Sequence, residues 1–411
     1  MILKTIRISF FFFLLPIFAL CQVRLGLDNL IANNYSQLQG KKIGLICNQT
    51  SVTSTGESAA KFFIKQKLFK FAALFSPEHG LFGERRAGVK SDSAEEFEGV
   101  SVYSLYGITR KPTKAMLKGL DALVFDIQDI GVRPYTFLST MIYVMEAAAE
   151  NNIEFIILDR PNPLSGERIE GNILDTSLRS FVGVISIPYL HGMTLGELAK
   201  MAKGEKWFHG AEKLKLTVVA MTGWKRVMYW NETGLKWIAP SPNIPTFESA
   251  VGCAMFGAVG ELGILSVGIG SDKQFLRLGS KLVKPEVLQY AVQSSLPDGI
   301  SAKREDYTVP YEDSTKTFLG MKIGLPKDLS SIDYFYGSEF MVLNNLLDDS
   351  VFARSYKGLP LSTKKMFEKV TGTHQLFKAL DTKKNIELFI ATWRKDVSRF
   401  RIMRKKYLLY K

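Results

Sequence analysis

Short apolar runs that alternate with helical patterns limit the possible folds of the first half of this chain more than any other feature. Mostly apolar runs of five or six residues occupy 42–47, 71–75, 121–126 and 154–158. Segments with apolar residues at helical spacing, such as 137–150, lie between them. Strands that are buried on both faces and joined through helices form a parallel sheet. We therefore predict an α/β domain over residues 22–239.

The second half of the chain has a different pattern. After two more expected strands, at 182–187 and 214–221, the stretch 234–246 is rich in proline and has no periodicity. Helical spacing then dominates, with one or two strands expected around 305–324. The expected helices lie near 247–259, 284–295, 332–347, 362–370 and 383–400. This pattern predicts a second, smaller α+β domain over residues 240–411.

Polar residues follow three of the predicted strands at the point where each strand ends. The segments concerned are 76–80 (SPEHG), 127–135 (IQDIGVRPY) and 159–163 (DRPNP). In an open parallel sheet, ligands bind in the crevice outside the carboxyl ends of the strands. We therefore expect a shared crevice for Glu78, His79, Asp126, Asp129, Arg133, Asp159 and Arg160.

Glu78 and His79 lie between a proline and a glycine, directly after a predicted strand. Proline fixes the approach of the chain, and glycine lets the backbone turn. A carboxyl group held at such a strand end can serve as a general acid. The alternative interpretation is a surface ion pair between Glu78 and Arg85 or Arg86.

Asp126 and Asp129 bracket a short turn and are candidates for a second catalytic carboxyl group. Glycoside hydrolysis uses two carboxyl groups, and their separation decides whether the anomeric configuration is inverted or retained. In the alternative interpretation, Asp126 caps the following element or pairs with Arg133.

Arg133 and Arg160 are candidates for binding a carboxylate of a ligand. A guanidinium group binds carboxylates bidentately in a fixed plane, which gives specificity as well as affinity. The alternative for each arginine is a structural ion pair with Asp129 or Asp159.

A metal site is a further alternative, built from His79, His191, Asp126 and Asp129, whose side chains are of the kinds that bind zinc or manganese. However, the sequence contains no HExxH motif or comparable ligand spacing. We therefore expect no metal and no other cofactor.

The first 21 residues have the features of a signal peptide. Lys4 and Arg7 precede an apolar run over 8–20, which is too short for a bilayer span of about 20 residues. A cut before Gln22 is expected, and lipidation at Cys21 is the alternative. No other segment has the pattern of a membrane span. We therefore expect an exported protein, periplasmic or secreted.

The net charge narrows the possible partners. The full chain carries +13, and loss of the two signal-peptide charges leaves +11 on the mature chain. This basic balance suits an anionic polymer. Nucleic acid is not expected, because the cations are dispersed except over 401–406 and no nucleic-acid motif is present. The two mature cysteines, Cys47 and Cys253, are expected to be buried free thiols.

The strand-end motifs, taken in order, resemble the exo-β-N-acetylmuramidase family of peptidoglycan-recycling glycosidases. The matching segments are 44–51, 75–86, 104–107, 121–135, 158–171, 188–194, 240–245 and 404–410. They cover nearly the whole mature chain. The resemblance implies a Rossmann-like domain joined to a smaller domain, with the active site in the cleft between them. It also implies release of terminal, non-reducing β-linked N-acetylmuramic acid from peptidoglycan disaccharides or glycan ends.

The resemblance also implies roles for individual residues. The acidic residue of the SPEHG motif falls on Glu78, which we expect to be catalytic, with assistance from His79 and Asp126. The expected substrate-binding residues are Asp129, Arg133, Tyr135, Asp159, Arg160, Asn162, His191 and Asn243. N-acetylmuramic acid differs from N-acetylglucosamine by a lactyl ether that carries a carboxylate. Arg133 or Arg160 is expected to bind that carboxylate.

One stretch departs from the family pattern. Ile269 stands between Gly268 and Gly270, where an arginine is usual in the family. This departure motivates the second hypothesis, which is a hydrolase of altered specificity or a non-catalytic binder of cell-wall sugars.

Overall fold

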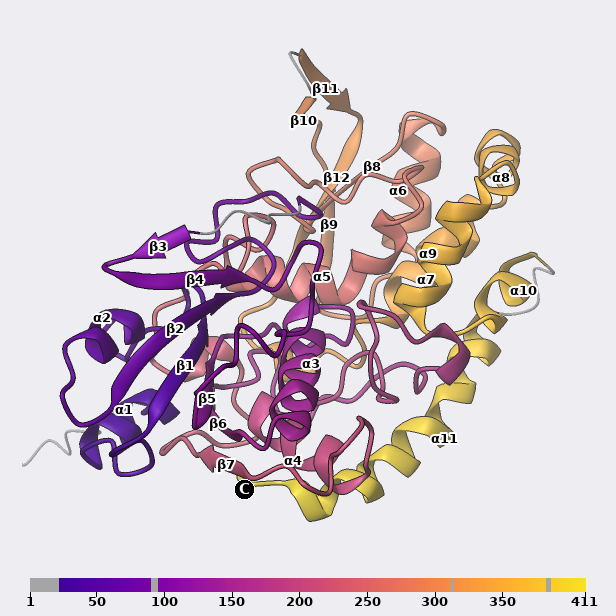
Figure 1. Cartoon of the computed structure of the whole chain (residues 1–411). Helices are drawn as coiled ribbons and strands as arrows, with labels where there is room; N and C mark the ends of the chain where they lie inside the picture. The colour runs from indigo at the N-terminus through magenta and orange to yellow at the C-terminus, as the bar shows by residue number, and fades with distance from the viewer. Residues whose placement is uncertain (1–21, 90–94, 312–313, 382–385) are drawn as a thin grey trace, which may run out of the picture.

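The computed structural model describes residues 22–89, 95–311, 314–381 and 386–411. The predicted signal peptide, with Cys21, lies outside these residues. The chain forms an α/β part around a seven-stranded sheet and a smaller part with antiparallel sheets (Figure 1). This confirms the predicted fold class.

The larger sheet has the strand order β3-β4-β2-β1-β5-β6-β7. Its neighbours are parallel except for β3, which runs antiparallel to β4. The strands are β1 Lys42–Cys47, β2 Lys70–Ser76, β3 Glu95–Phe97, β4 Val100–Ser104, β5 Ala122–Asp126, β6 Glu154–Leu158 and β7 Leu216–Val219. The four apolar runs that predicted the sheet are therefore confirmed as β1, β2, β5 and β6.

Helices cover both faces of this sheet. The helices of the α/β part are α1 Gly26–Ala32, α2 Ala59–Ile64, α3 Thr136–Glu150 and α4 Leu195–Gly204. The core under α1 and α2 includes Leu45 of β1, and the core under α3 and α4 includes the next residue, Ile46. Because successive side chains of a strand point to opposite faces, a sheet covered on both sides needs continuous apolar strands.

The helix α4 begins with a capping box. The hydroxyl of Thr194 accepts a hydrogen bond from the backbone N–H of Glu197 at 3.2 Å. The Glu197 carboxylate accepts in return from the backbone N–H of Thr194 at 3.1 Å. This reciprocal pair satisfies backbone donors that a helix start leaves without partners.

The expected strand at 182–187 was wrong, because this segment makes no strand. Its apolar residues Ile185 and Ile187 are instead buried in the core under α3 and α4. Burial alone therefore explains their apolar character, without a ladder of hydrogen bonds. The expected strand at 214–221 is present as the shorter β7.

The smaller part begins with α5 and carries a three-stranded antiparallel sheet of order β8-β12-β9 and a hairpin of β10 and β11. The helices are α5 Phe247–Gly260, α6 Pro285–Gln293, α7 Gly337–Leu346, α8 Ser350–Lys357, α9 Leu361–Thr371, α10 Gln375–Asp381 and α11 Ile386–Arg404. The strands are β8 Arg277–Gly279, β9 Ser301–Arg304, β10 Tyr307–Tyr311, β11 Ser314–Phe318 and β12 Gly320–Gly324. The five predicted helices are present, whereas α8, α10 and β8 were not predicted.

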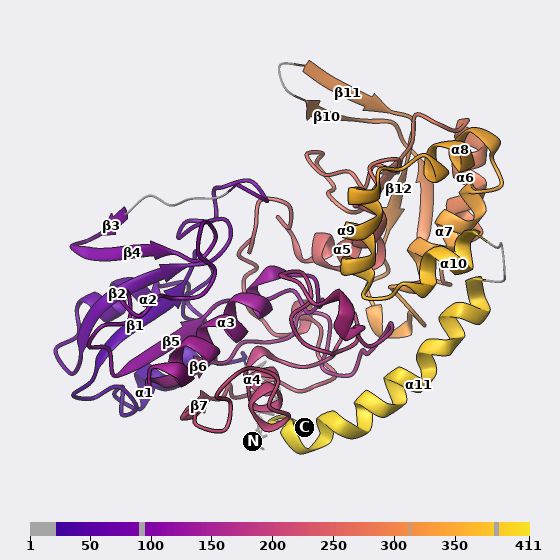
Figure 2. The ribbon, with the colours of Figure 1, turned by 45° about the vertical axis from the view of Figure 1, so that its right-hand side comes forward.

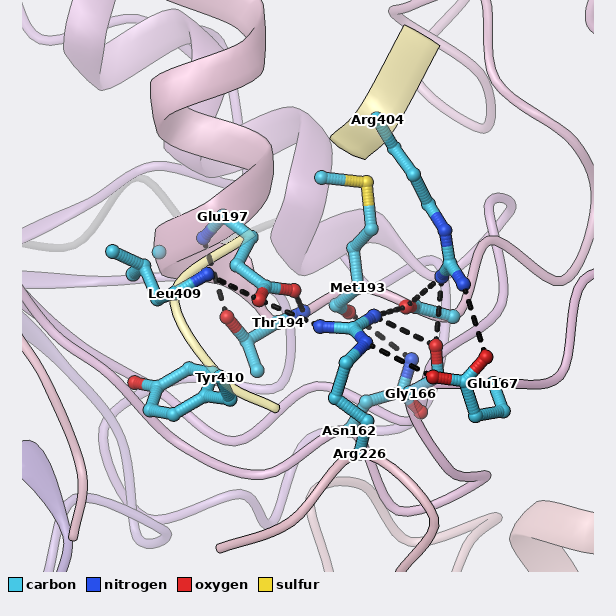
Figure 3. Close-up of polar contacts among 12 residues, drawn as sticks. Asn162, Gly166, Glu167, Met193, Thr194, Glu197, Arg226, Arg404, Leu409 and Tyr410 are labelled. Carbon is cyan, nitrogen blue, oxygen red and sulfur yellow. Dashed lines mark hydrogen bonds and ion pairs between the residues drawn. The ribbon is translucent and has the colours of Figure 1, made fainter. Parts of the chain in front are cut away.

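The C-terminal segment returns to the α/β part. The helix α11 runs along the outside of the molecule and brings the C-terminus close to α4 (Figure 2). There the backbone N–H of Leu409 donates to Glu197 at 2.9 Å. The guanidinium groups of Arg226 and Arg404 both donate to the carbonyl of Gly166, at 2.7 Å each (Figure 3). The last residues of the chain are thus bound within its first half.

Candidate active site

A cleft of about 480 Å³ opens between the two parts of the molecule. Small-molecule sites commonly have volumes of roughly 300–1,000 Å³. From the α/β part, the cleft is lined by Glu78, His79, Tyr106, Arg110, Tyr135, Thr136 and Phe181. From the connecting stretch and the smaller part, it is lined by Ser241, Asn243, Cys253, Glu261, Phe275, Met366 and Lys369.

Glu78 is the buried carboxyl group in this cleft, with 6% of its surface exposed. One carboxylate oxygen accepts a hydrogen bond from the backbone N–H of Gly88 at 2.9 Å, and the other from the Thr136 hydroxyl at 2.7 Å. Thr136 opens α3, so the carboxyl group of Glu78 lies beside the first residue of that helix. Arg85 contacts Glu95 rather than Glu78, so the alternative interpretation of a surface ion pair between Glu78 and Arg85 is not supported.

His79 lies in a backbone conformation that is rare for residues other than glycine. Its φ is 73°, and Gly80 follows with a φ of 80°. The ring N–H at Nδ1 donates to the carbonyl of Arg85 at 2.7 Å, which fixes the imidazole against its own loop. Strained residues of this kind cluster at functional sites. The strain therefore supports the prediction that His79 acts beside Glu78.

Tyr106 and Arg110 line the cleft beside Glu78, in the segment that follows β4. Burial, together with the negative charge of the nearby Glu78, raises the pKa of Tyr106 to about 12. The Arg110 guanidinium carbon lies 4.2 Å from the ring centroid of Phe181 and 5.6 Å from that of Tyr106. Tyr106 therefore lies close to both the Glu78 carboxylate and the Arg110 guanidinium.

Two more predicted residues, Tyr135 and Asn243, line the same cleft. Tyr135 is the residue before α3, and its ring contacts that of Phe137 with centroids 4.8 Å apart. Burial raises the pKa of Tyr135 well above its usual value. Asn243 belongs to the connecting stretch and is half-buried. Their substrate-binding roles remain predictions.

Arg133 does not reach the cleft. Its side chain is fully buried, and its two terminal nitrogens donate to four backbone carbonyls. Two of these carbonyls, of Val370 and Thr371, belong to the last turn of α9. Because carbonyls at a helix C-terminus lack partners and attract cations, Arg133 serves as a cap for α9. Its predicted contact with a substrate carboxylate therefore has no geometric support.

Arg160 and Asp126 form a buried bidentate ion pair. The Arg160 Nε lies 2.6 Å from one Asp126 oxygen, and an Nη nitrogen lies 3.0 Å from the other. The same Nη donates to the carbonyl of Val52 at 2.8 Å. Asp126 is fully buried, and neither side chain lines the cleft. Asp126 and Arg160 therefore form a structural ion pair with each other. This pair fits their positions better than roles in catalysis or substrate binding.

Asp159 and Asn162 also hold loops together, outside the cleft lining. Asp159 accepts hydrogen bonds from the hydroxyls of Thr194 and Tyr410 and from the backbone N–H of Gly196. Burial raises the pKa of Asp159 to about 6 in spite of these donors. The Asn162 amide donates to the carbonyl of Met193 at 3.1 Å. Neither residue lines the cleft.

Asp129 and His191 line a separate small cavity of about 10 Å³. One oxygen of Asp129 accepts from the backbone N–H of Gly131 at 2.7 Å. The other oxygen and the His191 Nε2 have no hydrogen-bond partner among the described residues. Burial raises the pKa of Asp129 to about 7. Burial, with the positive charges of Arg404 and Arg133, lowers the pKa of His191 to about 3, so this histidine is neutral.

The predicted metal alternative finds no suitable cluster of ligands. Within the described ranges, no three His, Cys, Asp or Glu side chains converge as metal ligands would. His79 lines the cleft and His191 lines the small cavity. Both described cysteines are free, with Cys47 buried and Cys253 partly buried in the cleft wall. Ile269 is 43% exposed and lies outside the cleft lining.

Reasoning from the sequence missed several residues of the cleft. The missed residues with polar side chains include Tyr106, Arg110, Thr136, Glu261 and Lys369. A signal was present for Tyr106, which belongs to the matching motif 104–107. Lys369 is contributed by α9 of the smaller part, and no sequence pattern connects it with Glu78.

In the described part of the chain, no helix is long and apolar enough to cross a membrane.

Comparisons with known proteins give a consistent result. Residues 43–248 match the family model for the N-terminal domain of exo-β-N-acetylmuramidase NamZ, and residues 252–410 match the model for its C-terminal domain. The peptidoglycan β-N-acetylmuramidase NamZ of Bacillus subtilis (strain 168) is 37% identical over 392 residues, which cover 95% of this chain and 92% of that protein.

Two solved structures from Bacteroides fragilis NCTC 9343, both of DUF1343 family proteins, are also similar. The first (BF0371) has a TM-score of 0.86 and 36% identity, and the second (BF0379) has a TM-score of 0.70 and 28% identity. Each comparison covers 95% of this chain and 99% of the other.

Proposed function

The chain belongs to the exo-β-N-acetylmuramidase NamZ family of peptidoglycan-cleaving glycoside hydrolases, and from this we propose that it releases terminal, non-reducing β-linked N-acetylmuramic acid from peptidoglycan fragments. The observation that carries the proposal is the position of Glu78, a buried carboxyl group in a cleft between the two parts. The cleft volume of about 480 Å³ lies in the range of small-molecule sites and can hold a terminal sugar.

Glu78 is the proposed catalytic carboxyl group and acts as general acid on the glycosidic oxygen. Two donors hold it in place, namely the backbone N–H of Gly88 and the hydroxyl of Thr136. Such fixed geometry is what proton transfer to a leaving group requires. Asp126 and Asp129, the partners proposed from the sequence, lie outside the cleft. Among the described residues that line it, Glu261 is the second carboxyl group.

The substitution Glu78→Gln tests this assignment. It keeps the size of the side chain but removes the transferable proton, so hydrolysis of a chromogenic β-N-acetylmuramic acid glycoside should fall by roughly 10²–10⁴-fold. Glu84→Gln is the matched control, because Glu84 is an exposed carboxylate in the same loop. Full activity of Glu78→Gln would remove Glu78 from the mechanism. Binding of muramic acid fragments without any turnover by the unmodified enzyme would favour a binding protein instead.

Exo-action is tested with defined glycan chains. An enzyme that acts on the terminal sugar should release single N-acetylmuramic acid residues from chains that begin with this sugar. Chains that begin with N-acetylglucosamine should remain intact until that residue is removed by another enzyme. Mass spectrometry of the products distinguishes this pattern from internal cleavage, which would give shorter oligosaccharides from both substrates.

We also propose that the enzyme is exported and acts on the cell wall. The charged start and apolar run of residues 1–21 support export, and the net charge of +11 on the remaining chain suits an anionic polymer. Intact mass measurement of the protein recovered from the periplasm or medium is the test. A chain that starts at Gln22 supports cleavage by a signal peptidase, and a lipid-modified Cys21 would show an anchored protein.

A further inference from the structure

We propose that Arg110 binds the lactyl carboxylate of N-acetylmuramic acid and thereby makes the cleft prefer this sugar to N-acetylglucosamine. This inference rests on the function proposed above. It assigns to Arg110 the role that the sequence had suggested for Arg133 or Arg160. Those two arginines are occupied by backbone carbonyls and by Asp126, respectively.

The charge environment of Arg110 differs from that of the buried arginines. Across the described ranges, no carboxylate lies within ion-pair distance of its guanidinium, and its recorded contacts are with aromatic rings. Arg110 is half-buried and lines the cleft. A cation that is partly removed from water and has no anionic partner is ready to bind an anionic ligand.

Stacking on Phe181 fixes the orientation of this cation. The guanidinium carbon lies 4.2 Å from the centroid of the Phe181 ring, which is a cation–π contact. The N–H groups of a guanidinium form a planar fork, and among the described residues those of Arg110 have no hydrogen-bond acceptor. A carboxylate can therefore accept two parallel hydrogen bonds from Arg110 without displacing a protein group.

The position of Arg110 relative to Glu78 matches the chemistry of the sugar. The bond to be cleaved is at carbon 1 of N-acetylmuramic acid, and the lactyl ether is at carbon 3 of the same ring. The acid and the cation must therefore lie about one sugar ring apart. Tyr106 lies close to both groups, because the charge of Glu78 raises its pKa and its ring centroid lies 5.6 Å from the Arg110 guanidinium carbon.

Lys369 is the competing cation. It lines the cleft from α9 and is half-buried. Its ammonium group is a point charge on a flexible stem and does not present a fixed planar pair of donors. No ring contact orients it among the described residues, whereas Phe181 orients Arg110. The geometry therefore favours Arg110.

The test compares two sugars in two assays. Binding of the β-N-acetylmuramic acid and β-N-acetylglucosamine glycosides is measured by calorimetry in the Glu78→Gln background, and steady-state kinetics are measured in the active enzyme. Arg110→Gln should weaken binding and raise KM for the muramic acid glycoside by about 10- to 150-fold. The glucosamine glycoside should be unaffected, and Arg110→Lys should restore part of the loss.

Arg179→Gln is the matched control, because Arg179 is an exposed arginine near Phe181 that does not line the cleft. An equal effect of Arg110→Gln on both sugars, or a selective loss with Lys369→Gln instead, would overturn the inference. Unimpaired binding of the muramic acid glycoside by Arg110→Gln would do the same. If the active enzyme hydrolyses neither glycoside, the proposed function fails, and the calorimetric comparison still decides the role of Arg110.

Discussion

Folding moves the titration of Asp129 into the neutral range. Burial raises its pKa from the ordinary value of 3.8 to about 7, because a charged carboxylate is poorly solvated in the interior. Between these values the folded chain keeps a proton that the unfolded chain has lost. The carboxyl group therefore lowers the free energy of unfolding progressively as the pH rises from about 4 to 7.

The substitution Asp129→Asn should remove this pH-dependent loss, since the amide is uncharged throughout. We expect the free energy of unfolding to increase by up to about 4 kcal/mol at pH 8 and to change far less at pH 4. Urea unfolding followed by circular dichroism at the two pH values measures the difference. Asp298→Asn, which changes an exposed carboxyl group, should show no such contrast. An equal change at both pH values would contradict the explanation.

The sequence could identify which residues gather at the carboxyl edge of the sheet, but not which of them face the cleft. The rule that ligands bind beyond strand ends brought Glu78 and Arg133 into one set. Their side chains separate because Arg133 is bound by carbonyls of residues 370 and 371, more than 200 positions further along the chain. A pattern of neighbouring residues in the sequence cannot indicate a contact over such a separation. Glu78 was found because its motif combines a strand end, a proline and a glycine.

At the scale of elements, Arg133 and α9 form a joint between the two parts. The helix ends at Gly372, whose φ of 72° is the left-handed conformation common at helix ends. The guanidinium of Arg133 lies directly against this glycine, since an added Cβ would be 2.4 Å from one of its nitrogens. Lys369 and Met366 of the same helix line the cleft. Arg133 therefore acts on the site through the position of α9.

The substitution Gly372→Ala should disturb this joint. Any alanine in the left-handed conformation costs about 1–2 kcal/mol. Here the methyl group would also displace Arg133 from the carbonyls that it caps, which adds about 1–3 kcal/mol. Gly40→Ala is a matched control, because Gly40 has a φ of 73° and no atom within 4 Å of the added Cβ. Urea unfolding of both variants separates the two contributions, and equal losses would argue against a role for the joint.

The elements that the sequence predicted well are those with enough length to show a period. The helix α3 has 15 residues and α5 has 14, and both were expected near their observed positions. The strands β3 and β8 have three residues each, which is too short for alternation to be visible. At 182–187 a strand was predicted where none forms. The segment is apolar because part of it is buried in the core, and burial requires apolar residues with or without a strand.

At the scale of the whole molecule, the two parts share structure that a simple division of the chain does not suggest. The core around α5 and α7 includes Ile130, Val132 and Tyr189 from the α/β part. Tyr189 stacks on Tyr336 with ring centroids 3.8 Å apart. Because these rings join the two parts, we expect the parts to unfold together rather than one after the other.

The C-terminal tail adds a second link between the parts, and its removal is the last test. The Tyr410 hydroxyl donates to Asp159 at 2.6 Å, its ring contacts Trp224, and the Lys411 carbonyl accepts from the backbone of Arg226 at 3.0 Å. Deletion of residues 409–411 should lower the free energy of unfolding by about 2–5 kcal/mol, because buried acceptors lose their donors and Trp224 is uncovered.

Lys411→Ala is the control for this deletion, since the contact of Lys411 uses its backbone and survives the change. Calorimetry of the deletion should show a transition at lower temperature in which both parts take part, because the tail and the shared core couple them. If only the α/β part lost stability and the smaller part kept its transition, the two would be independent units. That outcome would contradict the coupling expected from the shared core.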